Sequence, residues 1–363
     1  MAKKQQETTI SFASRRRFGI ELEVNAFDGK SRPDDGNPPK GIKEVCDLVN
    51  GASQHGAVRK GWENTENNAS WVVKPDSSCG MEVVSPALCG WDGLKDVLCV
   101  VNALSKDERV QADDRCSVHV HCEVADLSEA QLANVISWWV KSELVIMDAM
   151  PLRRKRNRYC QLIGMNDVFD HDGNYNSNQI ISKVGDVKYY SMNTYHRCRQ
   201  GRPTIEFRVT EGTGGKDAYL IKQWVRFLIH FVDVASKLPA PKPYLIPEGD
   251  NKHLTPWTGF AWLEPAQVLK MLYFDLNDSE LPGLRSHKPF KLSNGLMQTR
   301  DWFLGRLYKF MSRHPQGGLR HNAYKDLMEI VSKNERDLIG VESGEFLSPT
   351  ERDDSLFNDN FVY

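Results

Sequence analysis

The sequence has 363 residues, 40% of them hydrophobic, which is enough for one large domain with an extension or for two domains. Its 47 basic and 48 acidic residues nearly cancel, so overall charge does not favour a polyanion or a membrane surface as partner, and either role would need a local patch. No run of about 18 apolar residues is present to span a bilayer. We expect residues 1–16 to form a disordered leader, because they are partly basic and lack the apolar stretch of a signal peptide.

The eight cysteines are scattered along the chain, and no two of them have the CxxC spacing of a zinc ribbon or a thioredoxin-type pair. Several lie within apolar patterns, as Cys99 does in VLCVV. This usage predicts reduced cysteines and a cytoplasmic protein.

The first half of the chain mixes strands and helices irregularly. Alternating apolar and acidic residues predict a strand over 18–24, and Gly, Pro and Asp then predict a loop over 28–41. The elements expected next are a helix at 42–50, strands at 69–75 and 81–85, a helix at 91–105 and a strand at 116–124. The longest helical signal covers 128–149, begins beside Ser128 and is stopped by Pro151.

The second half begins with a basic run and a loop. Residues 170–180 are rich in Asn, Asp and Gly and are expected to form a mobile loop that could act as a lid. Strands at 187–193 and 203–210 and a helix at 216–236 follow. We expect a catalytic domain over 17–236, a linker over 237–243 and a mostly helical region over 244–363, with helices near 299–313 and 322–337. This mixture favours an α+β fold in which an antiparallel-rich, curved sheet carries helices on one face.

Four of the predicted strands combine an apolar face with a face of carboxylates or imidazoles. Side chains two apart on a strand share a face. The polar faces therefore gather Glu21 with Glu23, His119 with His121, Glu206 with Arg208, and Glu82. Each Glu could simply pair with Lys or Arg on an exposed sheet, and a lone HxH is more often a polar sheet face than a metal site. Four such strands in one sheet instead favour a site for a hard cation, Mg²⁺ or Mn²⁺, of the kind that bridges nucleotide phosphates.

Five segments carry a family resemblance: FGIELEV, DSSCGMEVVSP, CSVHVHCEV, KYYSMN and TIEFRVTEGT. Their order and spacing over residues 17–230 resemble the amidoligase family, a divergent branch of the glutamine synthetase and glutamate–cysteine ligase superfamily. The resemblance implies the curved sheet of that superfamily. It also implies a reaction in which ATP phosphorylates a carboxylate and an amine then displaces phosphate to form an amide, with two or three divalent ions bound.

The same resemblance implies roles for individual residues. Glu21 and Glu23 match the paired carboxylates of the first strand, and Glu82 matches that of the second acidic strand. His121 matches a metal ligand, His119 does so less closely, and Glu206 matches the metal ligand of the ExR strand. Arg208 matches the arginine that stabilises charge on the transferring phosphoryl group, a role that suits a planar, permanently charged guanidinium.

Further residues are assigned with alternatives left open. Asp76 could bind the incoming amine and help deprotonate it, or it could cap an Asx turn. In the basic run, Arg153 could contact nucleotide phosphates and Arg158, expected to be partly buried, could act in catalysis, whereas the same run could equally be a solvated helix end. Lys188, Tyr189 and Asn193 are placed in a strand where the family tends to contact nucleotide or substrate.

The leading hypothesis is therefore an ATP- and Mg²⁺- or Mn²⁺-dependent carboxylate–amine ligase. Its partners would be a small-molecule or peptide carboxylate and an amine donor, which could be a modified base, and an amidotransferase or biosynthetic enzyme could supply the amine. The alternatives are a metal-dependent hydrolase or phosphotransferase that uses the same Glu and His residues, and a non-catalytic binding module on a degenerate ligase fold. The oligomeric state is left open.

Overall fold

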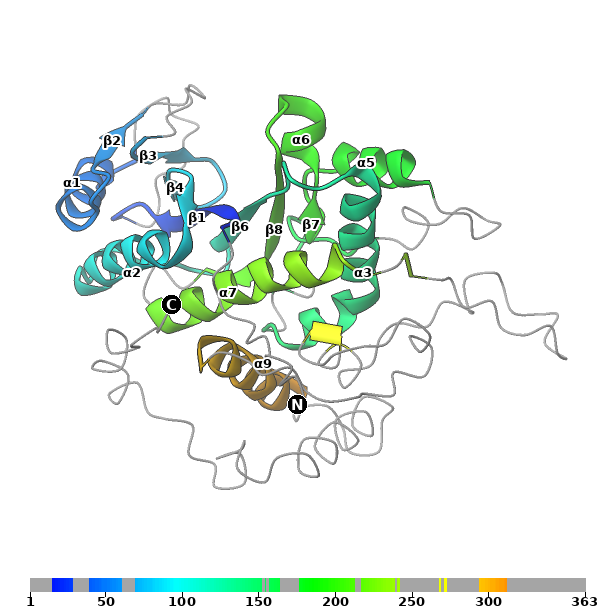
Figure 1. The fold of residues 1–363 in the computed structure, drawn as a ribbon. Helices are drawn as coiled ribbons and strands as arrows, with labels where there is room; N and C mark the ends of the chain where they lie inside the picture. The colour runs from blue at the N-terminus through cyan, green and yellow to red at the C-terminus, as the bar shows by residue number, and fades with distance from the viewer. Residues whose placement is uncertain are drawn as a thin grey trace, which may run out of the picture.

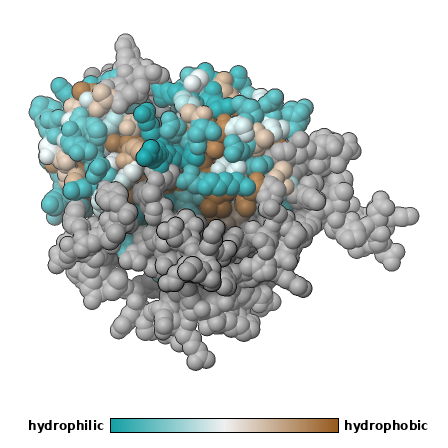
Figure 2. Space-filling view, in the orientation of Figure 1, coloured by the Kyte–Doolittle hydropathy of each residue, from teal (hydrophilic) through white to brown (hydrophobic). Residues whose placement is uncertain are grey.

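The computed structural model describes residues 15–28, 39–60, 69–151, 154, 157–163, 176–212, 217–238, 240–241, 268, 271–272 and 294–311. Arg153, the predicted helix at 322–337 and most of the predicted leader and of region 244–363 lie outside these residues. In the view of Figure 2, hydrophilic residues cover most of the described surface. Among the described helices, none has the length and apolar character needed to cross a membrane.

The described strands form one sheet with the order β2-β3-β4-β1-β6-β8-β7, and β5 pairs with the start of β1. The bounds are β1 Arg17–Asn25, β2 Ala57–Arg59, β3 Trp71–Asp76, β4 Gly80–Val84, β5 Leu88–Cys89, β6 Ser117–Glu123, β7 Met192–Asn193 and β8 Thr204–Glu211. The β2–β3 pair is parallel, and the other pairings of these strands are antiparallel. The predicted α+β fold is confirmed, and the four strands with polar faces are consecutive neighbours in the sheet.

The apolar face of the sheet is covered by helices. Helices α2 (Gly90–Lys106), α3 (Glu129–Asp148) and α7 (Ala218–Ala235) lie to one side of the sheet, and α9 (Asn294–Met311) packs on α7 (Figure 1). Ile20, Leu22 and Val24 of β1 are completely buried in this core. Their burial fixes the register, because a slip by one residue would turn the carboxylates of β1 into the core.

Helix boundaries follow local signals. Ser128 caps α3 in a capping box with Gln131. Helix α1 spans Ile42–Ala52. The turn between β3 and β4 needs a glycine at Gly80, whose φ is 126° and where a Cβ would lie 2.6 Å from the backbone nitrogen of Ala26.

Two predicted elements are wrong in part. Residues 177–180, expected in a loop, begin helix α5 (Ser177–Asp186), because Asn176 caps it and Ile180, Ile181 and Val184 are buried. The strand expected over 187–193 pairs with β8 only at Met192–Asn193, and Lys188 lies in a turn. The short helix α6 (Tyr195–Gln200) and strands β2 and β5 were not predicted.

Candidate metal centre

The register of the sheet brings the predicted ligands together as cross-strand partners. Glu23 of β1 is opposite Glu82 of β4, and Glu21 is opposite His119 of β6. His121 of β6 is opposite Glu206 of β8. Directly opposite side chains lie about 5 Å apart at Cβ. The strand pairing alone therefore places all six predicted metal ligands in one region of the polar face.

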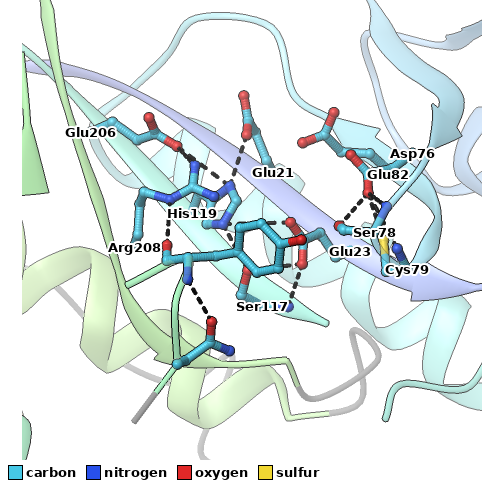
Figure 3. A network of polar contacts seen from close by, with 12 residues as sticks. Glu21, Glu23, Asp76, Ser78, Cys79, Glu82, Ser117, His119, Glu206 and Arg208 are labelled. Carbon is cyan, nitrogen blue, oxygen red and sulfur yellow. Dashed lines mark hydrogen bonds and ion pairs between the residues drawn. The ribbon is translucent and has the colours of Figure 1, made fainter. Parts of the chain in front are cut away.

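His119 lies in the middle of this constellation (Figure 3). Its Nδ1 is 3.0 Å from Glu21 Oε2 and 3.4 Å from Glu206 Oε1. Its Nε2 is 2.7 Å from Ser117 Oγ and 3.5 Å from Glu23 Oε1. Both ring nitrogens therefore have partners, which suits an organising role for His119.

Ser117 holds Glu23 in place from the start of β6. Its backbone N–H donates to Glu23 Oε2 at 2.6 Å, and its hydroxyl donates to the same oxygen at 2.8 Å. On the other side of β4, Lys74 Nζ lies 2.7 Å from Glu82 Oε2. Each of these carboxylates thus already has at least one polar partner and keeps further lone pairs for others.

His121 and Glu206 form a second part of the constellation together with His196 of α6. His121 Nε2 lies 3.0 Å from Glu21 Oε1. His196 Nε2 lies 3.4 Å from Glu206 Oε2, and the His121 and His196 rings meet edge to face with centroids 5.0 Å apart. His196 was not predicted, because it belongs to no strand pattern. A sequence signal for the start of α6 is Asn193, whose Oδ1 accepts a hydrogen bond from Tyr195 N.

Electrostatics divide the carboxylates into two groups. Burial opposes ionisation of Glu21, but His121 and His119 beside it hold its pKa well below the ordinary value. The pKa of Glu206 is likewise lowered against the effect of burial, through His196 and Arg208. Burial, and to a lesser extent the charge of Glu21, raises the pKa of Glu82 well above its usual range. Lys74 opposes this shift but does not cancel it.

Glu23 belongs with Glu82, since burial raises its pKa too. Buried carboxylates that repel one another in this way would be relieved by a nearby cation. Ionisation of both carboxyl groups on the β1–β4 side would therefore be favoured by a bound cation.

The donor atoms fit a divalent ion. Four overlapping groups each bring three ligand atoms within 4.8 Å of one another: His121, His196 and Glu206; Glu21, His119 and Glu206; Glu23, Glu82 and His119; and Glu23, Asp76 and Cys79. Within the described part of the chain, His121 Nε2 is buried and makes no hydrogen bond. The Oε1 atom of Glu21 lies 3.0 Å away, but not in the geometry of a hydrogen bond. The carboxylate oxygens beside it are the ligands that Mg²⁺ and Mn²⁺ prefer, and an imidazole nitrogen without a hydrogen bond can join them as a single nitrogen ligand.

Arg208 lies beside these ligands and is itself buried, with 7% exposure. Its Nη1 pairs with Glu206 Oε1, and its Nε donates to the carbonyl oxygen of Tyr159 at 3.0 Å. Asn193 of β7 is the cross-strand partner of Glu206. Its Nδ2 donates to Glu206 Oε2 at 3.0 Å and to the carbonyl oxygen of Lys188 at 3.0 Å. Asn193 is thus placed at the centre, whereas the Lys188 side chain is exposed.

Asp76 does cap an Asx turn at the far edge of the centre. Its Oδ1 accepts from Ser78 N at 2.7 Å and from Cys79 N at 3.2 Å (Figure 3). Burial opposes ionisation, but these hydrogen bonds, led by that of the Ser78 hydroxyl, lower the pKa of Asp76. A carboxylate with a low pKa is a poor proton acceptor, although it can bind a cation.

The predicted burial of Arg158 is wrong. Its side chain is exposed. The guanidinium stacks on the neighbouring ring of Tyr159, 4.7 Å from the ring centroid, and donates to the Tyr159 hydroxyl at 2.6 Å. Of the two basic residues of this run that the structure describes, Arg154 is the buried one, and it donates to the carbonyl oxygens of Arg208 and Val209. Arg154 therefore supports β8 from behind, a role that the run of basic residues did not reveal.

Comparison with known proteins gives one family match. The model of a family described as "Putative amidoligase enzyme" matches residues 14–232. A search of curated proteins returned no match.

Three solved structures resemble the chain weakly. A bifunctional glutathione synthetase from Pasteurella multocida is 9% identical, with 89% of this chain and 53% of that chain covered and a TM-score of 0.36. A glutamate–cysteine ligase from Francisella tularensis in complex with AMP is 10% identical, with 88% and 83% covered and a TM-score of 0.34. The complex of the prokaryotic ubiquitin-like protein Pup with its ligase PafA is 13% identical, with 93% of this chain and 65% of that chain covered and a TM-score of 0.31. The chain spans about half the length of the first of these, and the family assignment rests on the family match alone.

Proposed function

Because this chain belongs to the amidoligase family, we propose that it is an ATP-dependent ligase that joins a carboxylate to an amine through an acyl phosphate. The catalytic domain spans 17–236 in this proposal, with 237–243 as a linker and 244–363 as a helical extension. The observation that carries the proposal is the convergence of Glu21, His121 and Glu206 from three adjacent strands, with Arg208 beside them.

The proposed reaction has two steps. A carboxylate oxygen of the substrate attacks the γ-phosphorus of ATP, and ADP leaves. The amine nitrogen then attacks the acyl carbon, phosphate leaves with that oxygen, and the amine loses a proton. Bound Mg²⁺ or Mn²⁺ would neutralise phosphate and carboxylate charge. It would be held by Glu21, Glu23, Glu82, His121 and Glu206, with His119 and His196 as neighbours.

The protein's own residues then have distinct tasks. Arg208 would stabilise charge on the moving phosphoryl group, and a buried guanidinium is effective there because little water screens it. Asp76 would hold the amine as a cation, which its low pKa favours, whereas proton removal would need another group. Asn193 orients Glu206.

The test is ADP release from ATP by the full chain with Mg²⁺ or Mn²⁺ and a panel of carboxylates and amines. A ligase releases ADP at an appreciable rate only when both substrates are present, and it forms an amide in equal amount. Release of phosphate without an amine would instead identify a hydrolase, and release of ADP with a stable phosphorylated acceptor and no free phosphate would identify a phosphotransferase. Binding of ATP without turnover across a broad panel would favour a binding module.

A further inference from the structure

A buried carboxylate of helix α3 contacts two segments that border the candidate centre. Glu143 is completely buried, and it is not among the candidate ligand groups that the described residues form. The backbone N–H of Ile163 donates to both of its carboxylate oxygens at 3.1 Å, and the Ser191 hydroxyl donates to Oε1. A buried carboxylate is costly unless its oxygens accept hydrogen bonds, so Glu143 and these two donors hold one another in place.

Ser191 is held by a second side chain of the same helix. Trp139 lies one turn before Glu143 and therefore on the same face of α3. Its Nε1 donates to Ser191 Oγ at 3.0 Å, which leaves the single hydroxyl proton of Ser191 for Glu143. The Trp139 ring also packs on Phe207 of β8, with ring centroids 4.7 Å apart. Helix α3 thus fixes Ser191 from behind the sheet.

The two segments that Glu143 joins are the ones that hold Arg208. The carbonyl oxygen of Ser191 accepts from the backbone N–H of Arg208 at 2.8 Å, and that of Tyr159 accepts from Arg208 Nε at 3.0 Å. The segments are also tied to each other, because Ser191 N donates to the Gln161 carbonyl oxygen at 2.7 Å. The backbone and the guanidinium of Arg208 are therefore each one hydrogen bond away from a segment that Glu143 holds.

We propose that Glu143 is a positioning residue for Arg208, one that sets the direction of its guanidinium without touching substrate. This inference rests on the proposed function. The ion pair with Glu206 fixes one end of the guanidinium, whereas its plane also depends on the Tyr159 carbonyl oxygen at Nε. A group that stabilises charge in the transition state acts best when it is held in place beforehand. A displacement of about 1 Å from a distant change can cost up to about 100-fold in rate.

The test is a double-mutant cycle on ADP release by the full chain. Glu143→Leu keeps a side chain of similar length and removes the acceptor. Ser191→Ala removes only the hydroxyl link, and it carries the test if Glu143→Leu does not fold. The matched control is Ser137→Ala, which removes a completely buried hydroxyl of the same helix that donates to the Ala133 carbonyl oxygen at 2.7 Å. Each substitution is made in the wild type and in Arg208→Lys.

In the wild type, we expect Ser191→Ala to lower kcat about tenfold and Glu143→Leu to lower it about 10- to 100-fold, with the KM for ATP little changed. In Arg208→Lys, the same two substitutions should lower kcat less than about twofold, because residues that act through one another do not have additive effects. Ser137→Ala should leave kcat close to that of its parent in both backgrounds.

An equal fold-loss of kcat in the two backgrounds would show that Glu143 supports the fold in general, and it would overturn the positioning role while the proposed function stands. A kcat close to that of the wild type in Ser191→Ala and in folded Glu143→Leu would do the same. A wild type that releases no ADP across the panel of carboxylates and amines would overturn the proposed function and the inference together.

Discussion

Replacement of Arg208 by lysine separates phosphoryl-transfer chemistry from simple charge neutralisation. The guanidinium pairs with Glu206 and at the same time donates to the Tyr159 carbonyl oxygen. A lysine ammonium carries the same charge, but it is a point charge without the planar fork. Arg208→Lys can therefore still neutralise Glu206, while it cannot hold two phosphoryl oxygens in the geometry of the transition state.

The expected effects on rate and stability differ in size and in cause. If Arg208 contacts the transferring phosphoryl group, Arg208→Lys should lower ATP turnover about 100-fold, which corresponds to about 2.7 kcal/mol in activation free energy. ATP affinity should change little, because the contact is strongest in the transition state. The free energy of unfolding should fall by about 1–3 kcal/mol, since the partly buried carbonyl oxygen of Tyr159 loses its donor.

Arg306 provides a control for Arg208, because its partly buried side chain also contacts a backbone carbonyl and a carboxylate. Its Nε donates to the Ala149 carbonyl oxygen at 2.8 Å, and its Nη2 pairs with Glu211 of β8 at 2.8 Å. These contacts repeat those of Arg208, but with a carboxylate that belongs to none of the candidate ligand groups. Arg306→Lys should lose comparable stability and keep its turnover. The reasoning about Arg208 fails if its lysine variant turns ATP over at a near-normal rate, because neutralisation of Glu206 would then be its whole role.

Three further predictions concern the ligands. His121→Gln should weaken Mn²⁺ binding at least about tenfold, since it removes a ligand nitrogen. His119→Asn should lower the melting temperature and change Mn²⁺ affinity little. Equal losses of Mn²⁺ affinity in the two variants would contradict the assignment of His121 as ligand and His119 as organising residue. Burial disfavours a charged His121, yet Glu21 outweighs burial and raises the pKa of His121 above its usual value. The stability that this pair gives the metal-free protein is complete below the ordinary histidine pKa of about 6.5 and is lost as pH rises through the raised value. Mn²⁺ affinity should rise over that same interval, because the metal displaces the proton, and calorimetry in several buffers should show proton release; a flat pH profile would exclude His121 as a ligand. Glu206→Gln should abolish metal-stimulated ADP release. It should also lower the free energy of unfolding of the metal-free protein, measured by urea unfolding, by about 3–5 kcal/mol, because the charge of Arg208 loses its partner. Retained turnover would remove Glu206 from the site.

The sequence predicted the faces of the strands well, because alternation is a property of each strand alone. In β1 the pattern correctly separated Ile20 and Leu22, which are buried in the core, from Glu21 and Glu23 on the polar face. It could not give the register between strands. That register makes Glu23 a neighbour of Glu82, and it depends on turns and on packing between distant segments.

Short elements and long side chains were harder to predict. Helix α6 has six residues, too few for a periodic signal, so His196 was missed although it lies beside Glu206. The prediction for Arg158 failed because nearby apolar residues imply burial of the chain, while a long side chain can turn outward and stack on a partly buried ring. In the same run, only the fold shows that Arg154 is buried.

The most direct test of the ligase mechanism follows a single oxygen atom. A carboxylate substrate labelled with oxygen-18 is incubated with the full chain, ATP, Mg²⁺ and an amine, and the released phosphate is analysed by mass spectrometry. An acyl phosphate intermediate transfers one carboxylate oxygen to phosphate, so the account predicts one labelled oxygen for each amide formed. Unlabelled phosphate, released with or without amide, would contradict the acyl phosphate route that we propose for this protein.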